Sequence, residues 1–116
     1  MKIRLKLEKQ EISGTLADNA TARHFASLLP LSLTLEDYAH TEKISDLPEK
    51  LTTADAPAGS TPVAGSIAYY APWGNLALFY GPAPFAPGLV LMGTLDSGVE
   101  LLQTRARLSA TIALAE

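Results

Sequence analysis

The chain has 116 residues, of which 47% are hydrophobic and 18% charged, so we expect one globular domain over residues 1–116 and exclude a disordered or coiled-coil chain. A net charge of -3 with scattered Lys and Arg excludes the clustered basic surface that nucleic-acid binding needs. The absence of cysteine excludes disulfides, thiolate catalysis and Cys-ligated zinc, and it favours a cytoplasmic location.

The first ten residues, MKIRLKLEKQ, alternate apolar and charged side chains. Ile3, Leu5 and Leu7 share one face, which predicts a half-buried strand. A second strand is expected over residues 11–16, after a polar turn at residues 8–10. Neither the continuous apolar core of a signal peptide nor a run of about 20 apolar residues occurs, so we expect no membrane span.

Helical periodicity replaces alternation after an Asp or Asn cap at positions 18 and 19. The apolar residues that recur at helical spacing are Ala22, Phe25, Ala26 and Leu29. They predict a helix from Ala20 to Leu29 that Pro30 ends and that covers an opening or flank of the fold. Alternation then resumes over residues 31–35, which indicates another strand.

Ionisable side chains are densest just after this strand, at Glu36, Asp37, Tyr38, His40, Glu42 and Lys43. We interpret this group first as a solvated loop. It holds one His, whereas metal sites usually combine several strong ligands, so no metal is expected. Residues 39–65 are interpreted as turns, short pieces and an ordered surface loop.

Residues 65–80, GSIAYYAPWGNLALFY, combine aromatic bulk, Gly, Pro and a carboxamide with no charge. Two strands, at residues 67–71 and 76–80, are expected around the turn Pro72-Trp73-Gly74-Asn75, forming a hairpin. The residues assigned to the core are Ile67, Tyr69, Leu76 and Leu78. For Trp73 two interpretations stay open, a lid on the barrel end or a binding contact.

Prolines interrupt residues 81–88, so this segment is expected to be a loop before a strand at residues 89–95. Asp96 or Ser97 is expected to cap one helical turn through Leu102. Residues 105–115 alternate again and predict a final strand that pairs with the first. Seven or so strands with one short α-helix and a second helical turn define a mainly β fold, a closed or nearly closed barrel, with a sandwich as the alternative.

Five segments in fixed order, LLPLSLTLEDYAHTEK, LPEKL, APAG, GSIAYYAPWGNLALFY and PGLVLMGTLDSGVELL, resemble a family of small bacterial cyclophilin-like β-barrel proteins. The resemblance spans about residues 19–102 and implies a compact cyclophilin-type barrel. Prolyl isomerases of the cyclophilin type carry a motif of the form FHRxxxxFMxQGG, which this chain lacks. No isomerase residue is therefore carried over, and function has to be argued from the site.

The expected site is a barrel rim formed by the 72–75 turn, the 82–87 loop and the 37–43 loop. The candidate ligand-binding residues are Trp73, Tyr70, Asn75, Phe85, Asp37 and Glu42. Three functions stay open: binding of a small molecule or proline-containing peptide, weak prolyl isomerase activity, and a homodimeric structural role. No cofactor is expected.

An isomerase would need an apolar slot and a hydrogen-bond donor beside the imide nitrogen. Tyr70, Trp73, Phe79, Phe85 and Met92 are the residues expected to line such a slot. Its donor would come from Lys43, a Tyr hydroxyl, the Trp73 indole or Asn75.

Overall fold

Alternating apolar and polar side chains fold most of the chain into extended strands, as the sequence predicts. The computed structural model describes residues 1–115. Its elements are β1 (Lys2–Lys6), β2 (Glu11–Leu16), α1 (Ala20–Ser27), β3 (Leu31–Tyr38), β4 (Glu42–Asp46), β5 (Gly59–Ser60), β6 (Ser66–Tyr70), β7 (Asn75–Phe79), β8 (Ala86–Pro87), β9 (Leu89–Ser97), the 3₁₀ helix η1 (Val99–Leu102) and β10 (Leu108–Leu114).

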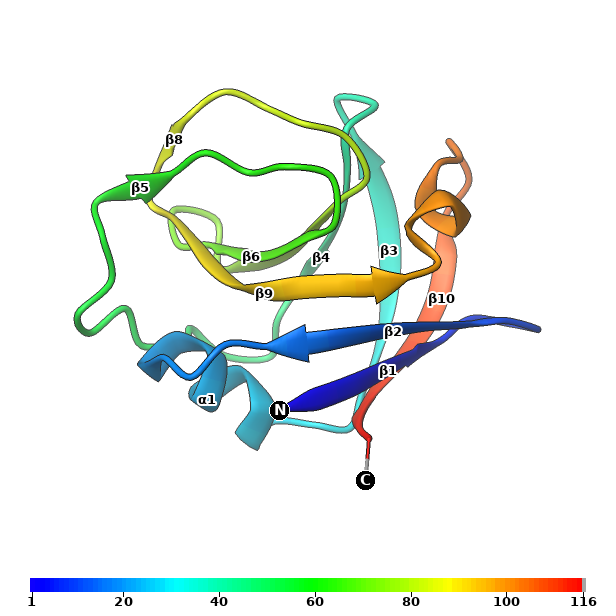
Figure 1. Ribbon diagram of the computed structural model, residues 1–116, viewed down its shortest axis with the longest axis horizontal. Coiled ribbons are helices and arrows are strands. Elements are labelled where there is room, and N and C mark those ends of the chain that lie inside the picture. The colour runs from blue at the N-terminus through cyan, green and yellow to red at the C-terminus, as the bar shows by residue number, and fades with distance from the viewer. Residues whose placement is uncertain (116) are drawn as a thin grey trace.

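Eight strands form a closed antiparallel barrel in the order β1-β10-β3-β4-β7-β6-β9-β2, with β2 pairing back to β1 (Figure 1). The expected partnership of the first and last strands is confirmed, since Ile3 lies opposite Leu114 and Leu5 opposite Ile112. Closure pairs both edges of each barrel strand and so protects them from pairing with other chains. The predicted mainly β, closed barrel is confirmed, and the sandwich alternative is excluded.

The inward faces of the strands form the main core. All four residues assigned to it from the central hairpin, Ile67, Tyr69, Leu76 and Leu78, are at most 1% exposed. The Tyr69 hydroxyl accepts a hydrogen bond from the Leu51 amide at 3.1 Å. This bond satisfies a buried phenol and ties the 47–58 segment to the barrel.

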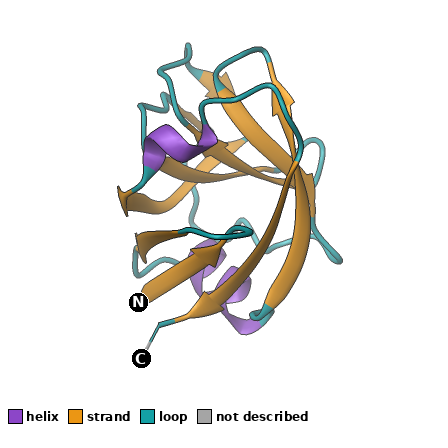
Figure 2. Cartoon of the chain, turned by 90° about the vertical axis from the view of Figure 1, so that its right-hand side faces the viewer, coloured by secondary structure: helices purple, strands orange, loops and turns teal. Residues whose placement is uncertain are grey.

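Helix α1 covers one end of the barrel beside the two chain termini (Figure 2). Asn19 is its N-cap, and the Asn19 side-chain oxygen accepts a hydrogen bond from the Ala22 amide at 2.8 Å. The Phe25 side chain is fully buried in the core, as expected, whereas Leu29 is only partly buried. The helix ends at Ser27, two residues before the expected end.

Close backbone contact closes the barrel where β2 meets β9. A Cβ atom on Gly93 would lie 2.1 Å from the Thr15 carbonyl oxygen, a distance that no side chain tolerates. The β2–β9 register also shifts between Ser13 and Gly14, which marks a bulge at this junction.

Three predictions about elements need correction. Residues 42–46, expected among turns, form the barrel strand β4. The central hairpin strands each start one residue earlier than expected, so Asn75 is the first residue of β7 and not part of the turn. Asp96 and Ser97 belong to β9, and the cap of η1 is Gly98, whose φ of 81° favours glycine.

None of the helices within residues 1–115 combines the length and the apolar character needed to cross a lipid bilayer.

Candidate ligand-binding site

A pocket lies on the outer wall of the barrel. Along β4 the side chains of Glu42 and Ile44 line it, whereas Lys43 between them is fully buried on the opposite face. The same alternation places Asn75 and Phe79 of β7 on the outer face. The expected rim site is therefore displaced from the barrel opening to the barrel wall.

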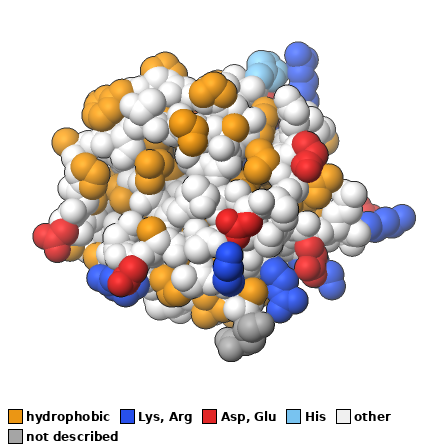
Figure 3. Space-filling view, in the orientation of Figure 1, with side chains coloured by type: hydrophobic (Ala, Val, Ile, Leu, Met, Phe, Trp, Pro, Cys, Tyr) orange, Lys and Arg blue, Asp and Glu red, His pale blue; other side chains and the backbone are white. Residues whose placement is uncertain are grey.

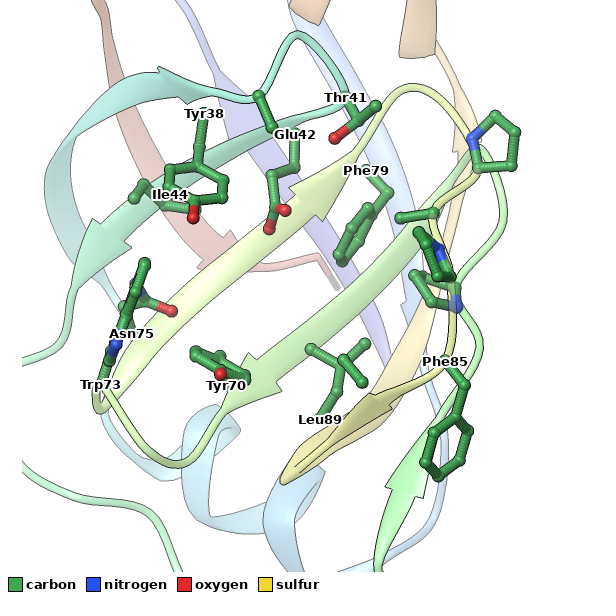
Figure 4. A pocket seen from close by; sticks show the side chains of 16 residues that line it. Tyr38, Thr41, Glu42, Ile44, Tyr70, Trp73, Asn75, Phe79, Phe85 and Leu89 are labelled. Atoms are coloured by element: carbon green, nitrogen blue, oxygen red, sulfur yellow. The ribbon is translucent and has the colours of Figure 1, made fainter.

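A proline-rich loop, residues 82–86, forms one wall of the pocket (Figure 4). Strand β8 at its end pairs with β5, and a Cβ atom on Gly59 would lie 2.5 Å from the Ala86 carbonyl oxygen, so this pairing needs glycine. The pocket has a volume of about 390 Å³, within the range of small-molecule sites. In Figure 3 hydrophobic side chains gather over β5 and β8, and most charged side chains lie along the lower and right-hand edges.

Three aromatic side chains gather at one end of the pocket. The Trp73 ring centroid lies 5.4 Å from that of Tyr38 and 5.2 Å from that of Tyr70, at interplanar angles of 85° and 83°. Edge-to-face pairs of this kind are favourable because the positive edge of one ring meets the negative face of the other. Trp73 is still 54% exposed, so about half of its surface remains available for contact with a partner.

Asn75 contributes a buried polar atom to the pocket. The residue is 2% exposed, and its Oδ1 atom has no hydrogen-bond partner among residues 1–115. Figure 4 shows this oxygen directed toward the space between Glu42 and Tyr70. Leaving a buried acceptor unpaired costs about 1 to 3 kcal/mol, and such groups in native proteins call for an explanation.

Glu42 contributes a partly buried carboxyl group to the pocket. Burial raises its pKa to about 7, because desolvation disfavours the ionised form. Within residues 1–115 no Lys, Arg or His side chain forms an ion pair with it. Figure 4 shows the carboxyl group pointing into the pocket. Near neutral pH the pocket therefore holds a carboxyl group that changes charge.

Asp37, in contrast, is not part of the pocket lining. Its carboxylate accepts a hydrogen bond from the Tyr80 hydroxyl and lies 3.4 Å from Lys43 Nζ and 3.3 Å from His40 Nδ1. Burial alone would raise the pKa of Asp37, but the Tyr80 hydrogen bond and the Lys43 charge outweigh it and hold this pKa below its usual value. Asp37 thus belongs to a network of hydrogen bonds and ion pairs with Tyr80 and Lys43, next to the pocket.

The interpretation of residues 36–43 as a solvated loop is wrong for Asp37, which belongs to β3, and for Lys43, which belongs to β4. Lys43 is 0% exposed, and its ammonium donates hydrogen bonds to the carbonyl oxygens of Thr104 at 2.5 Å and Ala106 at 2.8 Å. These contacts link β4 to the loop before β10. Lys43 is therefore engaged behind the pocket and is not available as the donor that an isomerase would need.

Phe85 lies at the far end of the pocket from Trp73 (Figure 4) and is 58% exposed. Phe79 is buried within the pocket wall, as the slot hypothesis expects, but Met92 faces the main core and does not line the pocket. Of the six candidate residues, the structure thus brings five together, namely Trp73, Tyr70, Asn75, Phe85 and Glu42.

Basic and metal-binding groups are missing from the described pocket. Among residues 1–115 no Lys or Arg side chain lines it, and all four arginines are exposed elsewhere. No cluster of three His, Asp or Glu residues in this part of the chain could hold a metal ion. Hydrogen-bond donors in the pocket are limited to hydroxyl groups, the indole, the Asn75 amide and protonated Glu42.

Several lining residues were not among the six candidates: Tyr38, Ala39, Thr41, Ile44, Pro62, Pro82, Ala83, Pro84, Ala86 and Leu89. Ile44 lies two residues after Glu42 and would have followed from alternation, had β4 been recognised as a strand. Pro62 and Ala86 join the pocket through the β5–β8 pairing. That pairing of two-residue strands leaves no periodic signal in the sequence.

An eight-stranded closed barrel with one covering helix and an apolar pocket on its outer wall defines a small cyclophilin-like β-barrel domain. The chain belongs to the Cyclophilin-like family, whose family model matches residues 5–113. The resemblance to a cyclophilin-like family, inferred from the five sequence segments, is therefore confirmed.

A solved structure shares the same fold. The hypothetical protein AF2241 from Archaeoglobus fulgidus, whose structure was determined in solution, is similar with a TM-score of 0.70 and 22% sequence identity, over 99% of this chain and 95% of that chain. At this identity the likeness supports the fold alone. No curated protein matches the chain.

Proposed function

We propose that the chain is a binding protein whose outer-wall pocket holds a small organic ligand or a short peptide. The observation that carries this proposal is the Asn75 side-chain oxygen, which is buried without a hydrogen-bond partner among the described residues in an otherwise largely apolar pocket. A bound hydrogen-bond donor would satisfy this oxygen and remove the cost of its burial.

The exposed aromatic side chains around the pocket support the same proposal. Trp73, Phe85 and Tyr38 are 54%, 58% and 43% exposed, although each is large and apolar. Aromatic residues at the edge of a concave site supply much contact area for a partner at low conformational cost. A pocket of about 390 Å³ favours a ligand of small-molecule size.

Trp73 is the only tryptophan in the chain, so its fluorescence reports directly on this pocket. We expect aromatic compounds or proline-containing peptides to change this fluorescence with saturation. Asn75→Leu should weaken the response of the same compound by about tenfold, because a hydrogen bond to a buried acceptor is lost. Ser13→Ala, which changes a half-buried residue of β2 outside the pocket lining, is the control. A silent Trp73 across cationic, neutral and anionic compounds and peptides would overturn the proposal.

Two measurements separate the alternatives. A proline-isomerisation assay with the same peptides tests isomerase activity, for which the pocket offers no Lys or Arg donor among the described residues. Sedimentation tests a homodimer formed through the exposed aromatic face. Acceleration of isomerisation would replace simple binding as the function, and a dimer that dissociates when Phe85 is changed to Glu would assign the pocket to self-association.

A further inference from the structure

Two side-chain groups aimed into the pocket, the Asn75 oxygen and the ionised Glu42 carboxyl group, can accept hydrogen bonds. Asn75 Oδ1 has no partner within residues 1–115, and Figure 4 shows it and the Glu42 carboxyl group directed toward the same space. An ionised carboxylate accepts hydrogen bonds only. A ligand that pairs with both groups has to bring its own N–H or O–H donors.

The aromatic end of the pocket also favours positive charge. Tyr38 and Tyr70 each stand nearly perpendicular to Trp73, within 5.4 Å and 5.2 Å between ring centroids. The face of an aromatic ring carries negative charge density, so a cation within about 6 Å of the ring centroid is attracted to it. Sites built from several such rings are known to bind ammonium groups.

The described part of the chain, residues 1–115, supplies no cation to this end of the pocket. Lys43 is held by Asp37 and by two carbonyl oxygens on the opposite face of β4, and no Lys or Arg among residues 1–115 lines the pocket. The carboxyl group of Glu42 is partly buried and has no counter-ion among the described residues, and this burial raises its pKa. A bound cation would provide that counter-ion.

We infer that the ligand is an organic cation, with an ammonium group at Glu42 and Asn75 and an apolar or aromatic body along Phe79 and Leu89. This inference rests on the proposed binding function and names the chemical class of its ligand. The buried cluster of Phe79, Leu89, Ala68 and Ala77 supplies the apolar wall. The carboxylate and the Asn75 oxygen discriminate an ammonium group from a neutral or anionic one.

Calorimetry with three compounds of similar shape tests this inference near pH 8, where Glu42 with a pKa of about 7 is mostly ionised. The compounds are phenethylamine, phenethyl alcohol and hydrocinnamate. We expect the amine to bind at least about tenfold more tightly than the alcohol, and hydrocinnamate to bind most weakly. Glu42→Gln should abolish the preference for the amine. Glu11→Gln, which removes an exposed carboxylate on β2, should preserve it.

A second readout follows the Glu42 carboxyl carbon by NMR through a pH titration. A bound ammonium stabilises the ionised form, so phenethylamine should lower the pKa of Glu42 from about 7 toward its ordinary value. The side chains to account for around Glu42 are Tyr38 on β3, Tyr70 on β6 and Tyr80 after β7. The same titration of a His40→Gln variant shows whether the imidazole in the β3–β4 turn contributes to the change in the pKa of Glu42.

The outcomes separate the ligand class from the binding function. Equal affinity for amine and alcohol, with no effect of Glu42→Gln, would overturn the cation inference and leave a binding pocket in place. Preference for hydrocinnamate would overturn it as well. Absence of binding by all three compounds, together with a silent Trp73 toward the wider compound set, would overturn both. A lysine-containing peptide as a fourth ligand shows whether the ammonium belongs to a free amine or to a peptide.

Discussion

Glu42 and Lys43 are adjacent on β4, yet their side chains lie on opposite faces of the barrel wall. Lys43 is fully buried and lies opposite the core residue Leu78, whereas Glu42 lies opposite Phe79 and lines the outer pocket. The two charges therefore do not neutralise each other. Lys43 is compensated by Asp37 and two carbonyl oxygens, and Glu42 is left without a cation among the described residues.

Replacing Glu42 by Gln is expected to stabilise the unliganded protein at neutral and higher pH. The pKa of Glu42 is about 7 in the folded protein against an ordinary value of 4.5. The folded state therefore holds its proton more tightly, and stability falls as pH rises from about 4.5 to about 7 and then levels off. Glu42→Gln should remove this fall and add about 1 to 2 kcal/mol near pH 8, allowing for partial exposure.

Urea denaturation of both proteins between about pH 4 and pH 8 measures this difference. Glu36→Gln is the control, because the Glu36 side chain is 59% exposed and pairs with exposed Arg107. Its curve should parallel that of the wild type. Parallel curves for Glu42→Gln and the wild type would show that Glu42 keeps an ordinary pKa.

Removing Lys43 should be among the most damaging single changes. Lys43→Met leaves the carbonyl oxygens of Thr104 and Ala106 without their donor and Asp37 without its buried cation. Breaking a buried ion pair in this way typically costs about 3 to 5 kcal/mol. The double variant Lys43→Met/Asp37→Asn should cost less than the sum of the two single changes, because the two residues share one network. Additive free energies of unfolding would argue against this network.

The two asparagines of the chain should respond in opposite ways to the same substitution. Asn75→Leu removes a buried oxygen that has no hydrogen-bond partner within residues 1–115, so the stability of the unliganded protein should stay unchanged or rise by about 1 kcal/mol. Asn19→Leu removes the N-cap hydrogen bond to the Ala22 amide and should cost about 1 kcal/mol. Chemical denaturation compares both. If Asn75→Leu lowered the free energy of unfolding more than Asn19→Leu does, Asn75 would have a structural role.

Gly93 should not tolerate even a methyl group. Alanine there would place its Cβ atom 2.1 Å from the Thr15 carbonyl oxygen across the β2–β9 junction, so the barrel would have to open locally. We expect Gly93→Ala to cost more than about 3 kcal/mol or to prevent folding. Gly81→Ala is the matched control, since its nearest contact would be 3.9 Å away. Thermal unfolding of the two variants should differ clearly, and equal melting temperatures would contradict the described closure.

Much of the barrel could be predicted because its strands carry a strict alternation. Residues 3–7, 31–35 and 108–114 bury alternate or partly alternate positions, and the first and last strands pair as expected. Strand β4 was missed because its outward-facing pocket residues and its buried Lys43 do not form an apolar and polar alternation. The turn between β3 and β4 also lacks the residue types that usually mark a turn in a sequence. Ala39 and His40 have φ angles of 55° and 56°, where Asn and Gly are usual.

The candidate site could be predicted in composition but not in position. Trp73, Tyr70 and Asn75 could be recognised because aromatic and amide side chains cluster, without any charge, within residues 65–80 of the sequence. The sequence does not show that β5 and β8 pair and thereby bring the 82–86 loop over the outer wall. Asp37 was grouped with Glu42 by proximity in sequence, although it belongs to the Lys43 network.

The most direct test of a cation-binding pocket on the outer wall is a ¹⁵N NMR titration of the protein with phenethylamine. We expect shifts of the Trp73 indole N–H, the Asn75 side-chain amide and the backbone amides of residues 82–86, and we expect Glu42→Gln to abolish them. No shifts, or shifts confined to α1 and the interior strand faces, would contradict this account.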